Sequence, residues 1–153
     1  MNIESIINLI FKDNRDKCEY RILGIDSIHN VVNIINLDEE KMPSIIEIDD
    51  FCNQIHDGTI EILEEDNYTV TVPEEKLNEK EKEIRDSNLK IINDLLEKVN
   101  FEIGNRTKLN ENMKLIAEEN NLTKRTIQTY LIRYLARGRT PNALLPDYYK
   151  CGG

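Results

Sequence analysis

The sequence has no apolar run long enough to span a bilayer, and its first residues lack a basic region and a cleavage site. We therefore expect neither a transmembrane helix nor a signal peptide. Only three cysteines are present, Cys18, Cys52 and Cys151, and they form no CxxC pair and no Cys/His cluster. This pattern excludes a recognisable zinc site or disulfide framework and favours a reducing cytoplasm.

Motifs for catalysis are also missing from the sequence. It contains no phosphate-binding loop, no GxSxG and no paired metal motif, and neither His29 nor His56 has triad partners. The acidic runs 38–40 and 64–66 fall in predicted turns, where carboxylates are typically solvated. We predict no catalytic residue, no metal ligand and no cofactor site in these 153 residues.

Charge divides the chain into two halves. Residues 1–75 hold 5 Lys and Arg against 18 Asp and Glu, a net charge of −13. Residues 76–153 hold 15 basic against 11 acidic residues, a net charge of +4. The overall charge of −9 argues against nucleic acid binding, but the basic C-terminal end reverses that argument locally. The acidic front either keeps the chain soluble or meets a protein partner.

The first half predicts strands at 18–26, 31–37, 59–63 and 68–72, with a short helix at 48–56. The runs around the turn at 64–67 alternate in period two, which is typical of half-buried strands. We expect a small antiparallel β-rich domain over residues 1–73, because Pro73 ends the last strand.

An amphipathic helix is predicted next, ending at Gly104-Asn105. Its core face comprises Ile84, Asn88, Ile91, Ile92, Leu95, Leu96 and Val99. With two further helices it forms a predicted three-helix domain over residues 74–140. The fold class is therefore α+β.

Residues 113–132 have the spacing of a helix-turn-helix, in which two helices cross over a turn of three or four residues. Ala117 is the small residue needed where the helices touch, and Asn121 tolerates the positive φ that the turn requires. Thr123 is a suitable N-cap for the second helix. Ile116, Leu122, Ile127 and Tyr130 are the expected core residues, and Asn120 stands where an apolar residue is usual.

The second helix, about 124–137, is predicted to turn Ile127, Leu131, Tyr134 and Leu135 inward. Its other face carries side chains of the kind that read base edges in a major groove, namely Lys124, Arg125, Gln128, Thr129 and Arg133. We expect Arg137 and Arg139 to meet backbone phosphates, and Thr123 and Thr126 to add hydroxyl contacts. An ordinary solvated surface helix is the alternative.

The C-terminal part strongly resembles the N-terminal region of the TnsB family. The resemblance rests on Leu122–Ile127, Tyr130–Tyr134 and the block Asn142–Tyr148 followed by Cys151-Gly152-Gly153, and more loosely on Tyr20–Asp26. TnsB proteins are DDE transposase subunits of heteromeric bacterial cut-and-paste transposons, related to phage Mu transposase.

The resemblance implies sequence-specific binding of duplex DNA at transposon ends by a cytoplasmic, nucleoid-associated protein. It also implies assembly with an AAA+ regulator and an endonuclease subunit. The family's Mg²⁺-dependent catalytic domain would lie outside these residues, so residues 141–153 are expected as a linker and the chain alone is not expected to be an enzyme.

Two other functions stay open. The first is a helix-turn-helix transcriptional regulator whose acidic front senses a ligand or dimerises. The second is a protein-interaction module whose helices dock a partner. The DNA sequence recognised, the partner of the acidic front and the oligomeric state cannot be read from the sequence.

Overall fold

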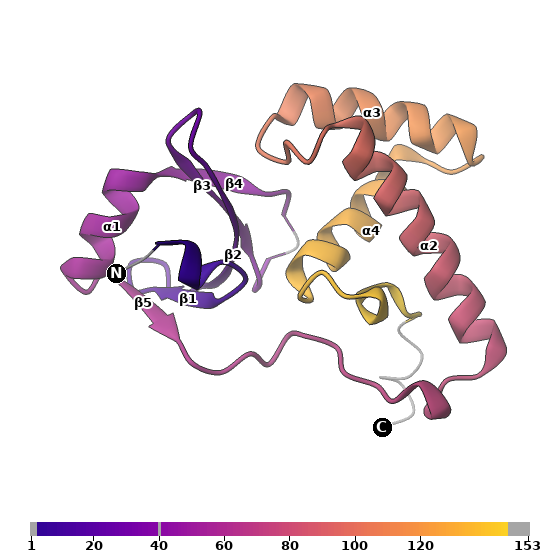
Figure 1. The fold of residues 1–153 in the computed structure, drawn as a ribbon, viewed down its shortest axis with the longest axis horizontal. Helices are drawn as coiled ribbons and strands as arrows, with labels where there is room; N and C mark the ends of the chain where they lie inside the picture. Colours follow the sequence, from indigo (N-terminus) through magenta and orange to yellow (C-terminus); the bar gives the residue numbers. More distant parts are fainter. Residues whose placement is uncertain (1–2, 40, 147–153) are drawn as a thin grey trace. The chain divides into compact units, whose positions relative to one another are not determined.

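The structure is a computed structural model that describes residues 3–39 and 41–146. The chain has an α+β fold, as predicted (Figure 1). It divides into two compact units, Met1–Tyr68 and Thr69–Gly153, and we describe each by itself. We call them the sheet unit and the helical unit. The division falls ahead of the boundary predicted at residue 73.

The sheet unit is built on five antiparallel strands in the order β4-β3-β2-β1-β5. The strands are β1 (Ile10–Asp13), β2 (Glu19–Asp26), β3 (Val31–Asn36), β4 (Ser44–Glu47) and β5 (Ile60–Leu63). The predicted antiparallel β-rich architecture is confirmed. The structure also has the predicted short helix, α1 (Ile48–His56).

Aromatic packing between α1 and the sheet forms the core of this unit. Phe51 on α1 and Phe11 on β1 are both buried, and their rings meet edge to face with centroids 5.5 Å apart. Tyr20 on β2 stacks on Phe11 at 5.1 Å. Burying one such ring contributes about 2–3 kcal/mol, so this cluster holds the helix against the sheet.

The predicted strand at 68–72 is wrong, because the only partner of β5 in the described sheet is β1. The turn after β5 is drawn elsewhere by Arg21, whose guanidinium is buried and donates to both carboxylate oxygens of Asp66 at 2.9 and 3.1 Å. It also donates to the Asn8 carbonyl at 2.8 Å. A buried arginine held in this way competes with closure of a tight hairpin. Neither β1 nor β4, strands of only four residues each, was predicted from the sequence.

The helical unit contains three α-helices and two short 3-10 helices among its described residues (Figure 1). These are η2 (Glu74–Lys76), α2 (Glu79–Lys98), α3 (Arg106–Glu119), α4 (Lys124–Ala136) and η3 (Pro141–Leu144). Asn78 and Glu81 form a capping box that starts α2. The predicted end of this helix at Gly104 is wrong, because Asn100 and Phe101 take positive φ angles of 54° and 60° soon after Lys98.

The core face of α2 also differs at its N-terminal end. Ile91, Ile92, Leu95, Leu96 and Val99 are buried as predicted, but Ile84 is only half-buried and Arg85 is buried beside it. The Arg85 guanidinium donates to Glu74, to Asp86 at 2.9 Å and to the Asn142 side-chain oxygen at 3.1 Å. Three acceptors compensate for its burial and join η2, α2 and η3.

Residues 141–145 differ from the linker that we expected at this position. Ala143, Leu144 and Leu145 are at most 2% exposed, and η3 contacts both α2 and α4. These apolar side chains complete the core, which is why the chain stays on the domain here. The remainder of the expected linker, residues 147–153, lies outside the described residues.

Thr69–Pro73 belongs to the helical unit and packs at the end of α4. A Cβ added to Gly138, which has a φ of 94°, would lie 2.5 Å from the Thr69 hydroxyl. The Asn142 amide donates to the Val72 carbonyl at 3.3 Å. We call residues 69–73 the strap; with Thr140 and Asn142 it borders an open groove of about 520 Å³. Across residues 3–39 and 41–146, no helix has the length and apolar character to cross a membrane.

Candidate nucleic-acid interface

A four-residue turn, 120–123, joins α3 to α4. Asn121 has a φ of 55°, as the sequence predicted, and Leu122 N donates to the Ala117 carbonyl at 2.9 Å. Ala117 is 4% exposed, so a small side chain occupies the place where the chain turns back. Asparagine tolerates this left-handed conformation better than most residues because its short polar side chain bonds locally.

Asn120 occupies the position at which an apolar residue is usual. Its side-chain amide donates to the Ile116 carbonyl at 2.8 Å. The same carbonyl also accepts from the Asn120 backbone N–H at 3.1 Å, so one residue supplies two donors to the last turn of α3. Asn120 is therefore exposed and caps the C-terminal end of α3, instead of packing into the core.

Thr123 caps α4. Its hydroxyl oxygen accepts from Thr126 N at 3.2 Å, and the two threonine hydroxyls lie 2.9 Å apart. The predicted N-cap is thus confirmed, and both hydroxyls are already bonded within the protein. Their first role is to fix where α4 starts.

The polar residues of α4 lie along two lines, since residues four apart share a helix face. Lys124 and Gln128 are half-buried and share a line with Ile132, which is 8% exposed. Arg125, Thr129 and Arg133 share the neighbouring line, and Arg125 is the exposed member. The second line, which we call the outer line, therefore lies further from the core than the first, which we call the inner line.

The inward face of α4 is confirmed in part. Ile127, Leu131 and Leu135 are at most 1% exposed. Tyr130 and Tyr134, which were also predicted to face the core, are half-buried. Their rings reach the boundary between the core and the polar face.

Two predicted phosphate-contacting residues lie at the C-terminal end of α4. Arg137 is its C-cap, and Arg139 has a φ of 58°. Arg139 N donates to the Tyr134 carbonyl at 2.9 Å, which turns the chain sharply after the helix. Gly138 between them packs against Thr69 of the strap.

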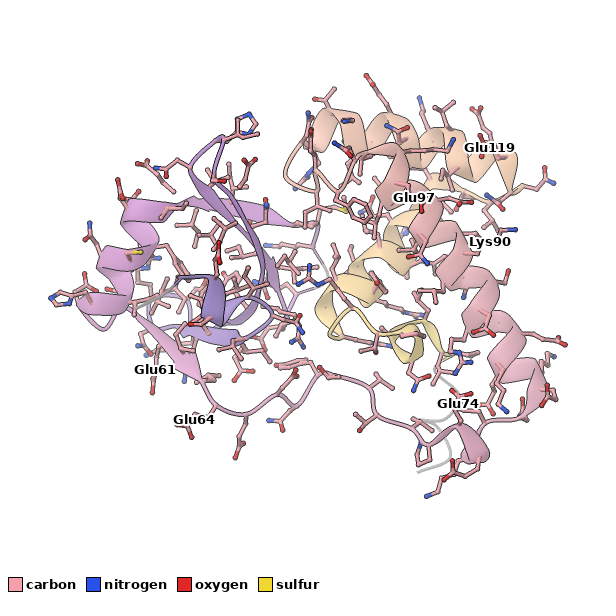
Figure 2. The ribbon with its side chains drawn as sticks, in the orientation of Figure 1. Glu61, Glu64, Glu74, Lys90, Glu97 and Glu119 are labelled. Carbon is pink, nitrogen blue, oxygen red and sulfur yellow. The ribbon has the colours of Figure 1, made fainter. Side chains whose placement is uncertain are left out.

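The charged residues of α4 are all basic, whereas those of α2 and α3 are of both signs. Residues 120–146 contain five basic and no acidic residues. Among the described residues, no carboxylate pairs with Lys124 or Arg125, whereas Lys98 pairs with Glu119 at 3.9 Å. Figure 2 shows Lys90 and Glu97 on α2 and Glu119 on α3, where both signs of charge occur. The basic residues of this stretch thus lie on α4 and in the turn that follows it, where they favour anionic ligands.

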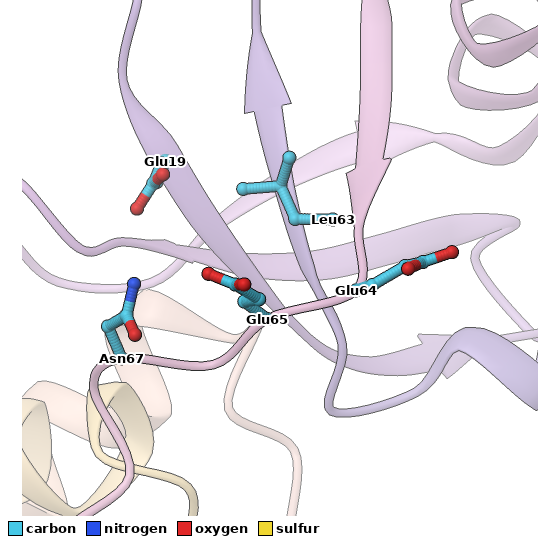
Figure 3. A pocket seen from close by; sticks show the side chains of 5 residues that line it. All are labelled: Glu19, Leu63, Glu64, Glu65 and Asn67. Atoms are coloured by element: carbon cyan, nitrogen blue, oxygen red, sulfur yellow. The ribbon is translucent and has the colours of Figure 1, made fainter.

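The carboxylates of the sheet unit make no comparable site. Glu19, Glu64 and Glu65 surround a hollow of about 290 Å³ with Leu63 and Asn67 (Figure 3). The Tyr68 hydroxyl donates to Glu19 at 2.8 Å, and burial together with this bond raises the pKa of Tyr68 to about 12. Within the part of the chain that the structure describes, no three His, Cys, Asp or Glu side chains are placed to hold a metal ion.

Both histidines belong to the sheet unit. His29 is in the turn between β2 and β3, where its ring Nδ1 lies 2.7 Å from the Asp26 carboxylate. This bond lowers the pKa of Asp26. His56 is the last residue of α1.

Part of the helical unit is similar to known proteins. Residues 85–148 match the family model described as the TnsB second domain. A curated relative, the transposon Tn7 transposition protein TnsB of Escherichia coli, is 49% identical over 37 residues. That alignment covers 24% of this chain and 5% of the relative.

The resemblance to TnsB drawn from the sequence is therefore confirmed from Arg85 in α2 through η3. It ties this segment to proteins of DNA transposition. The looser similarity of Tyr20–Asp26 lies outside the matched residues and stays a prediction. Because the alignment spans 5% of its relative, activity, substrates and partners are matters for proposal.

Proposed function

We propose that α3, the turn at 120–123 and α4 form a helix-turn-helix that binds duplex DNA, with α4 in the major groove. The observation that carries this proposal is the basic helix α4, which follows a four-residue turn in a stretch of sequence, 120–146, without acidic residues. An α-helix fits the major groove, and Arg, Gln and Thr side chains match the groups displayed there. The match of residues 85–148 to the TnsB second domain supports it independently.

The roles follow from the two lines of side chains. Arg125 and Arg133, on the outer line, are placed for guanine edges or phosphates, with Thr129 between them. Lys124 and Gln128, on the inner line, reach the groove wall or an adenine edge. Arg137 and Arg139, at the C-terminal end of α4, contact phosphates of the DNA backbone.

Within this proposal the biological ligand is the repeated sequence at transposon ends. The chain acts as the binding portion of a TnsB-like cut-and-paste transposase and does not itself break DNA. An AAA+ regulator and an endonuclease subunit are the proposed protein partners, and the metal-dependent chemistry belongs to a catalytic domain beyond these residues.

Fluorescence anisotropy on labelled duplexes tests the proposal. One duplex carries the end repeats that flank the gene and the other a scrambled sequence, and each is titrated at several salt concentrations. We expect tighter binding to the repeats and an affinity that falls as salt rises, because phosphate contacts release counterions.

Arg125→Ala is expected to weaken binding by about 1–3 kcal/mol. Lys90→Ala is the matched control, since Lys90 is an exposed cation on α2, and it should bind as the wild type does. Equal losses in both variants would reduce the interaction to general charge attraction. An affinity that depends on neither salt nor DNA sequence would favour the protein-interaction module instead. Mg²⁺-dependent cleavage of the duplex would contradict the proposal that this chain does not itself break DNA.

A further inference from the structure

Thr129 lies in the middle of α4 and uses its hydroxyl within the helix. Its Oγ1 donates to the carbonyl oxygen of Arg125 at 3.0 Å. Threonine often bonds back in this way to the carbonyl four residues earlier. The bond takes the only proton that this side chain can donate.

The same bond fixes the direction of the Thr129 methyl group. A β-branched side chain has few χ1 rotamers in a helix, and the rotamer that directs Oγ1 to Arg125 directs Cγ2 to a defined side. What Thr129 presents to a ligand is therefore a methyl group and an oxygen that only accepts.

Two arginines flank this methyl on the outer line of α4, one helical turn before and one after it. In the major groove, thymine alone among the four bases carries a methyl group, at C5, and threonine methyls make apolar contact with it. Long cationic side chains on either side exclude water from such a contact through their aliphatic stems.

We propose that Thr129 is the specificity-determining residue for a thymine, packing its Cγ2 against the C5-methyl between the positions contacted by Arg125 and Arg133. This inference rests on the proposed function, because it requires α4 in the major groove. It adds a base identity that basic charge alone does not supply.

The experiment begins with selection of bound sequences from a randomised duplex pool by the whole 153-residue chain. Each thymine of the selected site is then replaced in turn by deoxyuridine, which removes only the C5-methyl. We expect one replacement to weaken binding about threefold to fivefold, the effect of losing one buried methyl contact.

Two variants at the same position isolate the contact. Thr129→Ser keeps the hydroxyl and loses the methyl, so it should bind the thymine duplex as weakly as the wild type binds the deoxyuridine duplex, and show no further loss on replacement. Thr129→Val keeps a methyl and loses the hydroxyl, so it should still distinguish the two duplexes.

If an enriched site appears but every replacement affects wild type and Thr129→Ser equally, the thymine assignment is overturned while DNA binding stands. If no sequence is enriched and Arg125→Ala changes nothing, the proposed function fails, and the thymine assignment fails with it.

Discussion

The sheet unit and α4 differ in the acidic residues that accompany their cations. In the sheet unit the cations are largely held by carboxylates: Arg15 by Asp13, Arg21 by Asp66 and Lys41 by Glu39. On α4 the cations stand in a stretch without any carboxylate. The net charge of −9 therefore describes neither unit, and a function inferred from that total would miss the α4 surface.

The buried core of the sheet unit should produce the largest effect. Phe51→Ala removes a fully buried ring that contacts Phe11, and we expect a loss of about 3–5 kcal/mol in the free energy of unfolding of that unit. Urea denaturation followed by far-UV circular dichroism measures it. Phe101→Ala is the matched control, because that ring is 66% exposed, and its loss should be small.

In the helical unit the corresponding prediction concerns the ion pairs and hydrogen bonds of Arg85. Arg85→Ala removes donors to Glu74, Asp86 and Asn142, and we expect a loss of about 2 kcal/mol, the usual scale for hydrogen bonds to charged groups. The same denaturation assay applies, with Lys80→Ala as an exposed control on α2. A loss no larger than that of the control would mean that the Arg85 bonds to η2 and η3 add no stability to this unit.

The turn between α3 and α4 should give a smaller effect. Asn121→Ala places a residue with no local hydrogen-bonding side chain at a φ of 55° and should cost about 1 kcal/mol. Asn121→Gly should recover stability, because glycine adopts this conformation without strain. Equal stabilities for the alanine and glycine variants would show that the turn tolerates other conformations.

The smallest expected effect is a pH dependence confined to the sheet unit. The Arg15 guanidinium beside Asp13 holds the pKa of that carboxyl below its usual value. The lowered pKa adds stability above the unfolded value, near 3.8, and this stability is lost as the pH falls through the folded value. We expect less than about 1 kcal/mol between pH 6 and pH 3, because the pair is partly exposed.

Asp13→Asn is the control for this titration. It removes the carboxyl, so its stability should change less than that of the wild type over the same pH range. An identical change in both proteins would assign the acid sensitivity to other carboxylates.

Local features were predictable from the sequence, and distant pairings were not. Asn121 and Thr123 follow from the conformations of single residues, and α1 follows from a short apolar periodicity. Pairing of β5 with β1 joins residues about fifty positions apart and competes with a hairpin that looks equally favourable locally. Arg21 is buried against Asp66 in the turn after β5, and the sequence around Arg21 does not indicate this distant acceptor.

The candidate site shows the same division. The sequence located the polar residues of α4, but it could not distinguish the inner line through Gln128 from the outer line through Thr129, because burial of Ile132 depends on tertiary packing. Arg85 was also missed. The only sign of its role in the sequence is its position next to the apolar face of α2. Two of its acceptors, Glu74 and Asn142, come from segments outside this helix.

The strap gives the molecule a particular response to tension. A pull applied at residue 68 passes first to the contact of Thr69 with Gly138 and to the bond between Val72 and Asn142. Because Asn142 also accepts from Arg85 at 3.1 Å, part of the pull passes from there to α2. Force arriving from the N-terminal side is therefore delivered at the C-terminal end of α4, next to Arg137 and Arg139, and bypasses α3.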